Sequence, residues 1–535
     1  MVGGRLVEVE SSFQPCLDDP SGDACGAVLE SHRNPFFLED QPGATHTTGW
    51  FGAYDATPGR HAVAAETTGD LAAAVDFARD AGIPVVVKGT GHDYLGRSSG
   101  SGSLLIWTHR MRDISVHDSF TVDGAFGEPG VPAISVGAGV RWLEAYQALL
   151  GSGQYVNGGG CTTVGAAGGF TQGGGYATFS RRFGTAAGNV LELEVVTADG
   201  EIVVTNGSRH PDLFWALRGG GGGTFGVVSK ATFRTHPSPA TIGAVFGTIS
   251  AIDDRSYRQL VRAVVHLLPE LTDEHWGEQI RFGPDNRVDL TLTTLGLTDE
   301  RARSIWRPLL DWVSARPGTF ESDVRVASGP FQSFWDADGW EELAPAMICR
   351  DRRAGQPSSH FWWSTNQPEV SQYVNAYQSR WLPSRLVENV PARVADVLFE
   401  ASRLSGFGIH LNKGLAGAAP EALARDRLTS VNPAVFEATG LIIMASLQQY
   451  VYPGVPGHAP DPEVAEASSR AVGQAMALIR SLTPDAGAYV NEADFFEPDW
   501  PRSFWGDNYP RLLGIKQRYD PSNLFSAHHG VGSET

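Results

Sequence analysis

Two reactive side chains stand inside two glycine-rich segments of this chain. His92 lies in KGTGHDYLGRSSG (residues 88–100), and Cys161 lies in NGGGCTTVGAAGGFTQGGG (residues 157–175). Imidazole and thiolate groups are nucleophiles, so each segment carries one side chain that can bond to an electron-poor partner. Glycine lets the backbone approach a ligand closely and turn its N–H groups toward an anion such as a pyrophosphate. The pair of segments therefore indicates an anion cradle that contains two nucleophiles.

Glycines also mark ordinary turns, and a lone histidine or cysteine is more often structural than functional. Neither segment fits the dinucleotide pattern of strand, G-x-G-x-x-G, helix and later acidic residue, and neither contains the G-K-[ST] of a phosphate loop. A nicotinamide site and an ATP site are thus disfavoured. The occurrence of both nucleophiles in two such segments favours a functional role for each.

Together with DLFWALRGGGGGTFGVV (residues 212–228) and DPSNLF (residues 520–525), these segments resemble the berberine-bridge-enzyme-like branch of the vanillyl-alcohol-oxidase/PCMH flavoproteins. The resemblance is close over residues 35–240, good in the C-terminal segment, and limited to general texture in the middle. It implies that FAD is held bicovalently, with His92 on the 8α carbon of the isoalloxazine and Cys161 on carbon 6. Bicovalent attachment is expected to raise the redox potential of the flavin and to retain it over an open cleft.

The resemblance implies further contacts with FAD, which fall into four groups. Around the pyrophosphate we expect Lys88, Gly89, Thr90, Gly91, Asp93, Ser98 and Ser99; beneath the flavin, Gly165, Gly169, Gly173 and Gly174; near the adenine, Asn189, Val190, Gly226 and Val227; and from the C-terminal segment, Asn491 and Asn523. Val164 matches the position of the family's oxygen gate. A valine there is associated with oxidases, so hydrogen peroxide is the expected by-product.

The segment AYVNEADFF (residues 488–496) corresponds to the family's Y-x-N-Y segment, which returns to the flavin and presents a base to the substrate. Tyr489 and Asn491 match, whereas Glu492 replaces the second tyrosine. The identity of the catalytic base therefore stays open. To act as the base near neutral pH, Tyr489 would need a lowered pKa, and Glu492 or Asp494 would need a raised one. Tyr489 is equally well explained as a strand residue with a hydrogen-bonded hydroxyl. His410, on a strand of the middle region, is a further candidate.

The expected activity is an FAD-dependent oxidation of a small molecule. Hydride would leave a C–H bond next to oxygen or nitrogen in an alcohol, carbohydrate, phenol or amine, and O₂ would be reduced to hydrogen peroxide. The alternatives are a dehydrogenase that uses another electron acceptor and a flavin-loaded binding protein without turnover. Six tryptophans suggest a stacking platform for sugars or aromatic rings, although core packing explains most of them equally well: Trp335, Trp340, Trp362, Trp363, Trp500 and Trp505.

Composition narrows the classes of partner. The formal net charge of -19 would repel nucleic acids and anionic lipids, and no apolar run is long enough to suggest a membrane span. The N-terminus lacks a basic-then-apolar signal pattern, so we expect a cytoplasmic protein. His528 and His529 are adjacent without further ligand spacing, so no metal is predicted. A disulfide between Cys16 and Cys25 stays open, as does the oligomeric state.

The length of 535 residues exceeds what one core usually supports, so we predict a two-lobed α+β fold. A PCMH-type FAD-binding domain (residues 1–239) would be completed by the C-terminal segment (residues 489–535). A substrate domain (residues 240–488) would be an antiparallel sheet covered by helices. Residues 1–60, rich in Gly, Pro, Asp and Ser, read as an irregular lead-in. A helix capped near Thr67, a strand over residues 83–87 and a hairpin over residues 191–205 are expected to follow.

Overall fold

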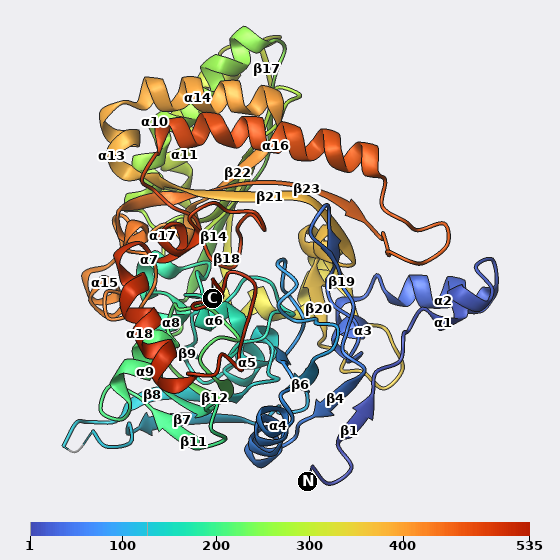
Figure 1. The fold of residues 1–535 in the computed structure, drawn as a ribbon. Coiled ribbons are helices and arrows are strands. Elements are labelled where there is room, and N and C mark those ends of the chain that lie inside the picture. Colours follow the sequence, from blue (N-terminus) through green and yellow to red (C-terminus); the bar gives the residue numbers. More distant parts are fainter. Residues whose placement is uncertain (1, 126, 535) are drawn as a thin grey trace.

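The first sheet carries the first glycine-rich segment at its edge. The computed structural model, which describes residues 2–125 and 127–534, orders this sheet β1-β4-β6-β5 (Figure 1). Strands β4 (His61–Ala64), β6 (Leu104–Trp107) and β5 (Val85–Lys88) are parallel, with β5 at one edge, and β1 (Leu6–Glu8) pairs antiparallel with β4 at the other edge. Helix α4 (Thr68–Ala81) begins at the predicted cap, where Thr67 and Asp70 form a capping box. The loop that contains His92 follows the end of β5 directly.

The second sheet leads into the loop of Cys161. Its antiparallel strands follow the order β11-β10-β12-β8-β7, and their bounds are Ile202–Thr205, Val190–Val196, Val227–Arg234, Val131–Gly137 and Ile114–Phe120. Strands β10 and β11 form the predicted hairpin. Strand β8 is followed by helix α5 (Trp142–Ala148), and the second glycine-rich segment then runs into the short helix α6 (Gly169–Gln172).

A ten-stranded sheet forms the other layer of the molecule. Its order is β17-β14-β16-β15-β22-β23-β21-β2-β3, with β18 also paired to β14. Its strands within residues 241–449 are β14 (Thr241–Ala251), β15 (Gly277–Phe282), β16 (Arg287–Leu295), β17 (Phe320–Ser322), β18 (Arg325–Pro330), β21 (Gln372–Pro383), β22 (Phe407–His410) and β23 (Ala438–Gln449), whereas β19 (Ile348–Arg350) and β20 (Phe361–Trp363) form a separate pair. These strands pair antiparallel with one another, as predicted.

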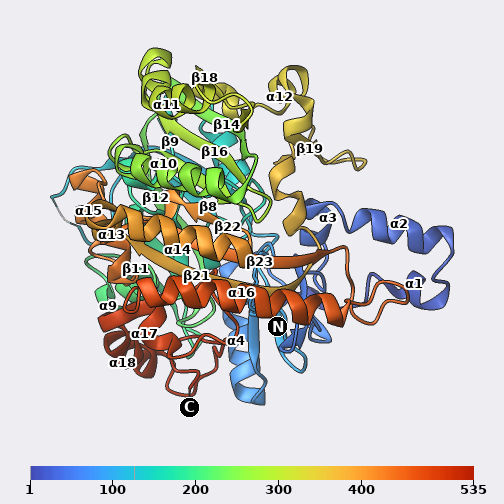
Figure 2. The same ribbon diagram turned by 90° about the horizontal axis from the view of Figure 1, so that it is seen from above.

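Four long helices cover one face of this sheet. They are α10 (Asp254–Asp273), α11 (Asp299–Ser314), α14 (Pro391–Leu404) and α16 (Pro462–Leu482), and they lie side by side over the strands (Figures 1 and 2). Each has an apolar face at helical spacing; in α10 this face includes Leu260, Val264 and Leu268, all buried. The opposite face of the sheet is left to meet the first lobe.

The expectation that residues 1–60 are irregular is wrong. They form helices α1 (Gln14–Asp18), α2 (Asp23–Ser31) and α3 (Pro35–Glu39) and strands β2 (Thr47–Trp50) and β3 (Tyr54–Asp55) besides β1. Strand β2 pairs in parallel with β21, a partner more than 300 residues away, which local sequence patterns do not reveal. Helices α1 and α2 form a projecting arm (Figure 1).

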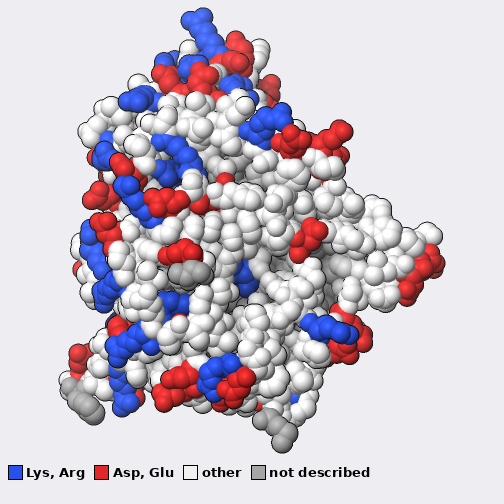
Figure 3. Space-filling view, viewed as in Figure 1, with Lys and Arg blue, Asp and Glu red and all other residues white. Residues whose placement is uncertain are grey.

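The disulfide that the sequence left open is present in this arm. Cys16 of α1 and Cys25 of α2 are bonded, and they pack against Tyr452 and Val455. Disulfides persist mainly in oxidising compartments, so this bond weighs against the expected cytoplasmic location. No helix among the described residues is long and apolar enough to cross a membrane. On the face shown in Figure 3, acidic and basic side chains are interspersed around a broad uncharged area.

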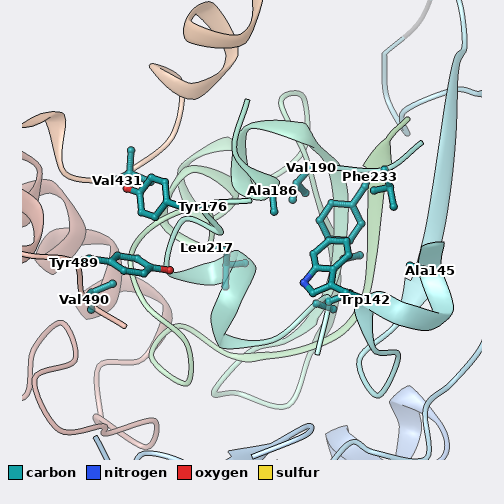
Figure 4. Close-up of a cluster of buried hydrophobic side chains, with 14 of the residues drawn as sticks. Trp142, Ala145, Tyr176, Ala186, Val190, Leu217, Phe233, Val431, Tyr489 and Val490 are labelled. Atoms are coloured by element: carbon teal, nitrogen blue, oxygen red, sulfur yellow. The ribbon is translucent and has the colours of Figure 1, made fainter. Parts of the chain in front are cut away.

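One hydrophobic core joins the two lobes to the C-terminal segment. Its members include Trp142 and Phe233 of the first lobe, Val431 after α15 (Pro420–Asp426), and Tyr489 and Val490 near the C-terminus (Figure 4). The C-terminal segment therefore cannot leave the first lobe without exposing apolar surface.

A buried arginine forms hydrogen bonds between the two lobes. Arg181, in helix α7 (Ser180–Phe183), is 2% exposed and donates to the carbonyl oxygens of Trp276, Ala416 and Thr439, which lie in or beside the ten-stranded sheet. The planar guanidinium can serve several acceptors at once. The interface between the lobes thus depends on hydrogen bonds as well as on apolar contact.

Arg181→Met is expected to destabilise the protein by about 3 kcal/mol or more, because each carbonyl left buried without a donor costs about 1–3 kcal/mol. Arg182→Met is the matched control, since Arg182 is exposed on the same helix, and should change stability by no more than about 0.5 kcal/mol. Thermal unfolding followed by circular dichroism measures both. Equal melting temperatures for the two variants would contradict this role of Arg181.

Candidate active site

The first glycine-rich loop is held against the N-terminal segment by a lysine. Lys88, at the end of β5, is buried and donates to the carbonyl oxygens of Gln41, Pro42 and Ala44 at 2.8, 2.6 and 2.8 Å. Its ammonium group is therefore committed to the protein, and only its backbone is left for the expected pyrophosphate contact. Gly91 has φ +81°, a conformation that favours glycine, and His92 follows it directly.

The two predicted nucleophiles meet at one hydroxyl group. Nε2 of His92 lies 2.9 Å from Oγ1 of Thr163, and Sγ of Cys161 lies 3.6 Å from the same oxygen. A second hydrogen bond joins the two loops, because the backbone N–H of Gly165 donates to the side-chain Oγ1 of Thr90 at 3.1 Å. Burial raises the pKa of the Cys161 thiol to about 12, so its proton must be removed before the sulfur can attack a partner.

A charged network that the sequence did not reveal lies behind His92. Glu39, at the end of α3, is fully buried and accepts a hydrogen bond from Nε of Arg141. Its other oxygen, Oε1, lies 3.7 Å from Nε2 of His92 and 3.8 Å from Nε2 of His46. The rings of His46 and His92 stack with centroids 3.5 Å apart. Glu39 and His46 were missed because their segment read as an irregular lead-in.

The C-terminal segment closes over both loops. Nδ2 of Asn491 donates to the carbonyl of Gly169 at 2.8 Å and to the hydroxyl of Tyr489 at 3.0 Å. Arg97, paired with Asp93, donates to the carbonyl of Val490 at 3.3 Å and to Oδ1 of Asn491 at 3.4 Å. A Cβ atom on Gly173 would lie 2.2 Å from Nδ2 of Asn491, so a glycine is required there.

Half-buried polar side chains gather beside the loop of Cys161. Nζ of Lys413 donates to Glu492 and lies 5.9 Å from the ring centroid of Tyr489. The hydroxyl of Tyr94 donates to Glu369 at 3.2 Å. Burial raises the pKa of Glu369 and of Glu278. These two carboxylates were also missed, since nothing in their local sequence marks them.

Glu278 has an unusual backbone as well as an enclosed carboxylate. Its φ is +68°, in the left-handed region, although it lies within strand β15. Such backbone strain is concentrated at functional sites in proteins. A Cβ atom on Gly160 would lie 3.4 Å from its Oε1, so this carboxylate faces the residue that precedes Cys161.

The candidate bases differ in their surroundings. Burial, together with the neighbouring Glu492, raises the pKa of Tyr489. Asp494 already accepts hydrogen bonds at both oxygens, from the N–H of Phe496 at 3.1 Å and from Gln378 at 2.7 Å. Burial lowers the pKa of His410 well below its usual value, and its charged neighbours are Lys413 and Arg281.

The residues expected near the adenine and near the pyrophosphate fall into two groups, according to whether the protein already uses their polar atoms. Asn189 donates to the carbonyls of Phe183 and Thr185 and accepts from His236, so its whole amide is used within the protein. By contrast, Oγ of Ser99 and Oδ1 of Asn523 are buried and have no hydrogen-bond partner among the described residues. Added Cβ atoms on Gly168 and on Gly169 would meet open space. Unpaired buried polar atoms and open backbone fit a polar cofactor such as a dinucleotide.

Family models match at both ends of this site. Residues 59–206, which carry His92 and Cys161, match the model of an FAD binding domain. Residues 488–532, which carry Tyr489, Asn491 and Glu492, match the model described as berberine and berberine like.

Whole-length relatives agree with these matches. The chain is 31% identical to the FAD-linked oxidoreductase ZEB1 of Gibberella zeae, with 100% of this chain and 89% of the relative covered. It is 33% identical to the VAO-type flavoprotein oxidase VAO615 of Thermothelomyces thermophilus, with 87% and 74% covered.

Solved structures agree as well. The VAO-type flavoprotein MtVAO615 from Myceliophthora thermophila superposes with a TM-score of 0.80 at 29% identity, covering 100% of this chain and 93% of that one. Glucooligosaccharide oxidase from Acremonium strictum, which is described with a 6-S-cysteinyl, 8α-N1-histidyl FAD, shares the fold with a TM-score of 0.69 at 19% identity, covering 98% and 99%. The recognition made from the sequence motifs is thereby confirmed: the chain is an FAD-linked oxidoreductase of the vanillyl-alcohol-oxidase and berberine-bridge-enzyme-like family.

Proposed function

We propose that this enzyme is an oxidase that holds FAD through both His92 and Cys161 and oxidises a small organic substrate at a C–H bond next to oxygen or nitrogen. The observation that carries the proposal is the convergence of the two side chains on the hydroxyl of Thr163. Two nucleophiles from separate loops would otherwise have no reason to share one half-buried position. When bound, FAD supplies the hydride acceptor. The bicovalent FAD described for glucooligosaccharide oxidase supports the same arrangement.

The remaining FAD contacts belong to the same proposal. Thr90 joins the two loops, because its hydroxyl oxygen accepts a hydrogen bond from the N–H of Gly165, and Asp93 pairs with Arg97 within the first loop. Ser99 and Asn523 offer the unpaired polar atoms described above. We assign no direct FAD contact to the side chains of Lys88 and Asn189, because protein groups already use them.

Glu492 is the base in this proposal. Its carboxylate is half-buried beside Tyr489 and accepts a hydrogen bond from Lys413, and a carboxylate in this position can accept the proton that leaves as hydride is transferred. Tyr489, kept protonated by its raised pKa, serves as a hydrogen-bond donor beside it. Asp494 is not proposed as the base, because both of its oxygens already accept hydrogen bonds. His410 is not proposed either, because its lowered pKa makes the imidazole a weak base.

The substrate would lie between the Cys161 loop and the ten-stranded sheet. Nε1 of Trp363 donates to the carbonyl of Gly160 at 3.1 Å, and its half-buried ring is part of a cluster with Phe334 and Trp340. Trp335, Trp362 and Trp505 are instead buried in the core. An aromatic wall beside a carboxylate suits a sugar, phenol or aromatic amine.

Covalent attachment is expected to survive denaturation. Acid-precipitated wild-type protein should stay yellow, and so should His92→Ala and Cys161→Ala, because each variant keeps one link. The double variant should release its flavin into the supernatant. Absorbance of pellet and supernatant measures the effect, and a colourless wild-type pellet would refute attachment altogether.

A thiol titration provides the control. Cys16 and Cys25 are bonded and Cys349 is free, so denatured wild-type protein without reductant should show one thiol per chain. Two thiols would mean that Cys161 is unattached. The His92→Ala variant should again show one.

Glu492→Gln is expected to lower kcat by about 10²- to 10⁴-fold, the usual contribution of a positioned base. The attached flavin should remain, because Glu492 lies outside both links. Anaerobic bleaching of the flavin by an excess of substrate measures the reductive step, after a panel of alcohols, carbohydrates, phenols and amines has identified one. Asp494→Asn is the matched control, and its flavin should be bleached at nearly the wild-type rate. Slow bleaching in Asp494→Asn with normal bleaching in Glu492→Gln would assign the base to Asp494.

Oxidase activity is expected because Val164 occupies the family's oxygen-gate position. Aerobic turnover should release one hydrogen peroxide per substrate oxidised, and an artificial electron acceptor should not be required. A peroxide assay in air, together with a measurement of acceptor reduction under nitrogen, distinguishes an oxidase from a dehydrogenase. Turnover that needs the acceptor would identify a dehydrogenase, and a flavin that no substrate bleaches would indicate a binding protein.

A further inference from the structure

The network behind His92 joins three separate parts of the chain. Glu39 comes from α3, His46 from the segment before β2, and Arg141 from the start of α5. Arg141 is buried, and its guanidinium also lies 4.7 Å from the ring centroid of Phe36. The side chains of Glu39, His46 and Arg141 are all buried. Their position behind the imidazole points to an effect on His92 itself.

The geometry selects one nitrogen of His92 as the nucleophile. Nε2 faces the hydroxyl of Thr163 at 2.9 Å and Oε1 of Glu39 at 3.7 Å. A negative carboxylate on that side favours the tautomer that carries its proton on Nε2, and this leaves the lone pair on Nδ1. Stacking against His46 limits rotation of the ring. His92 is thus oriented as an Nδ1 nucleophile before any partner arrives.

Glu39 is held in the form that this role requires. Burial alone would raise the pKa of Glu39, but the charge of Arg141 and the nearby imidazoles of His46 and His92 lower it overall. Oε1 has no hydrogen-bond partner within usual distance among the described residues, so it remains directed at the two imidazoles. Substitution at Nδ1 creates a positive imidazole ring, and the nearby carboxylate stabilises that charge.

We propose that Glu39 is the positioning residue for flavin attachment at His92: it orients the imidazole and stabilises the charge that develops as Nδ1 bonds to FAD. This rests on the proposed function. The new bond joins Nδ1 to the 8α methyl carbon of the isoalloxazine. The methyl group and the imidazole each lose one hydrogen, and O₂, the acceptor of the proposed function, takes both hydrogens and their electron pair as hydrogen peroxide.

A metal ion is the competing explanation for the same cluster. The possible ligand atoms of Glu39, His46 and His92 lie within 4.8 Å of one another. However, Arg141 already pairs with the carboxylate, and Lys88 is buried close enough to interact with both Glu39 and His46. Two resident cations oppose a third positive charge, so the observations favour the role in attachment.

The experiment isolates the histidyl link in the Cys161→Ala background. In that variant, acid-stable flavin can be attached only through His92. Adding Glu39→Gln should lower acid-stable flavin per chain by about 10- to 100-fold, the usual effect of removing a carboxylate that supports a functional histidine. Absorbance of the denatured protein and the mass of the His92 peptide provide readouts that do not depend on turnover.

Two controls separate attachment from folding. Asp40→Asn removes the next carboxylate, which pairs with His109 and Arg353 and lies 3.9 Å from Arg141 but does not pair with His92, and it should leave the histidyl link intact. Glu39→Gln with His92→Ala should retain flavin through Cys161, which shows that the protein still folds and binds FAD. Loss of flavin there would overturn the specific role of Glu39, because it would mean a general defect.

The remaining outcomes are equally decisive. Undiminished histidyl flavin in Glu39→Gln with Cys161→Ala would overturn the inference. Stoichiometric zinc in the purified wild type, lost in Glu39→Gln, would assign the cluster to a metal instead. If Cys161→Ala alone already releases its flavin, the histidyl link of the proposed function fails, and the inference fails with it.

Discussion

The buried ion pair between Glu39 and Arg141 constrains the position of the whole N-terminal segment. A carboxylate without exposed surface is costly unless a cation compensates it, and Arg141, at the start of α5, is that cation. Helix α3 must therefore stay against α5. From this position β2 can reach the edge of β21, and the segment of residues 41–44 can receive the three hydrogen bonds of Lys88. The loop of His92 is fixed by the same contacts.

The site illustrates how flexible loops become rigid. Glycine-rich segments lose more conformational freedom on folding than others, so they need external contacts to hold one shape. Those contacts come from side chains: Thr90 binds the loop of Cys161, Asn491 binds the carbonyl of Gly169, and Arg97 reaches the C-terminal segment. Each contact crosses between segments that are distant in the sequence. These contacts hold the loops of His92 and Cys161 in one arrangement.

The two lobes contribute different chemistry. The first lobe supplies His92, Cys161 and a backbone that fits a dinucleotide. The second lobe supplies Glu278 from strand β15, Glu369 from the 3-10 helix Ser364–Glu369, and Lys413, which pairs with Glu492, from the 3-10 helix Leu411–Lys413. Arg181 holds these surfaces together. Variation in the sheet side chains can therefore change the substrate while the cofactor site is preserved, in keeping with the weak resemblance of the middle region.

The sequence by itself determined the family, the cofactor, the two nucleophiles and most regular elements. These features depend on local patterns: glycine spacing around His92 and Cys161, the cap at Thr67, and apolar periodicity in helices such as α10. Tertiary structure alone decided that Thr163 lies between His92 and Cys161, that Glu39 and His46 lie beside His92, that Glu278 lies against Gly160, and that Glu369 accepts a hydrogen bond from Tyr94. It also gave Glu492 and Asp494 different hydrogen-bond partners. The physical reason is that a buried carboxylate takes its role from the charges and donors packed around it, and these come from segments that no local pattern connects.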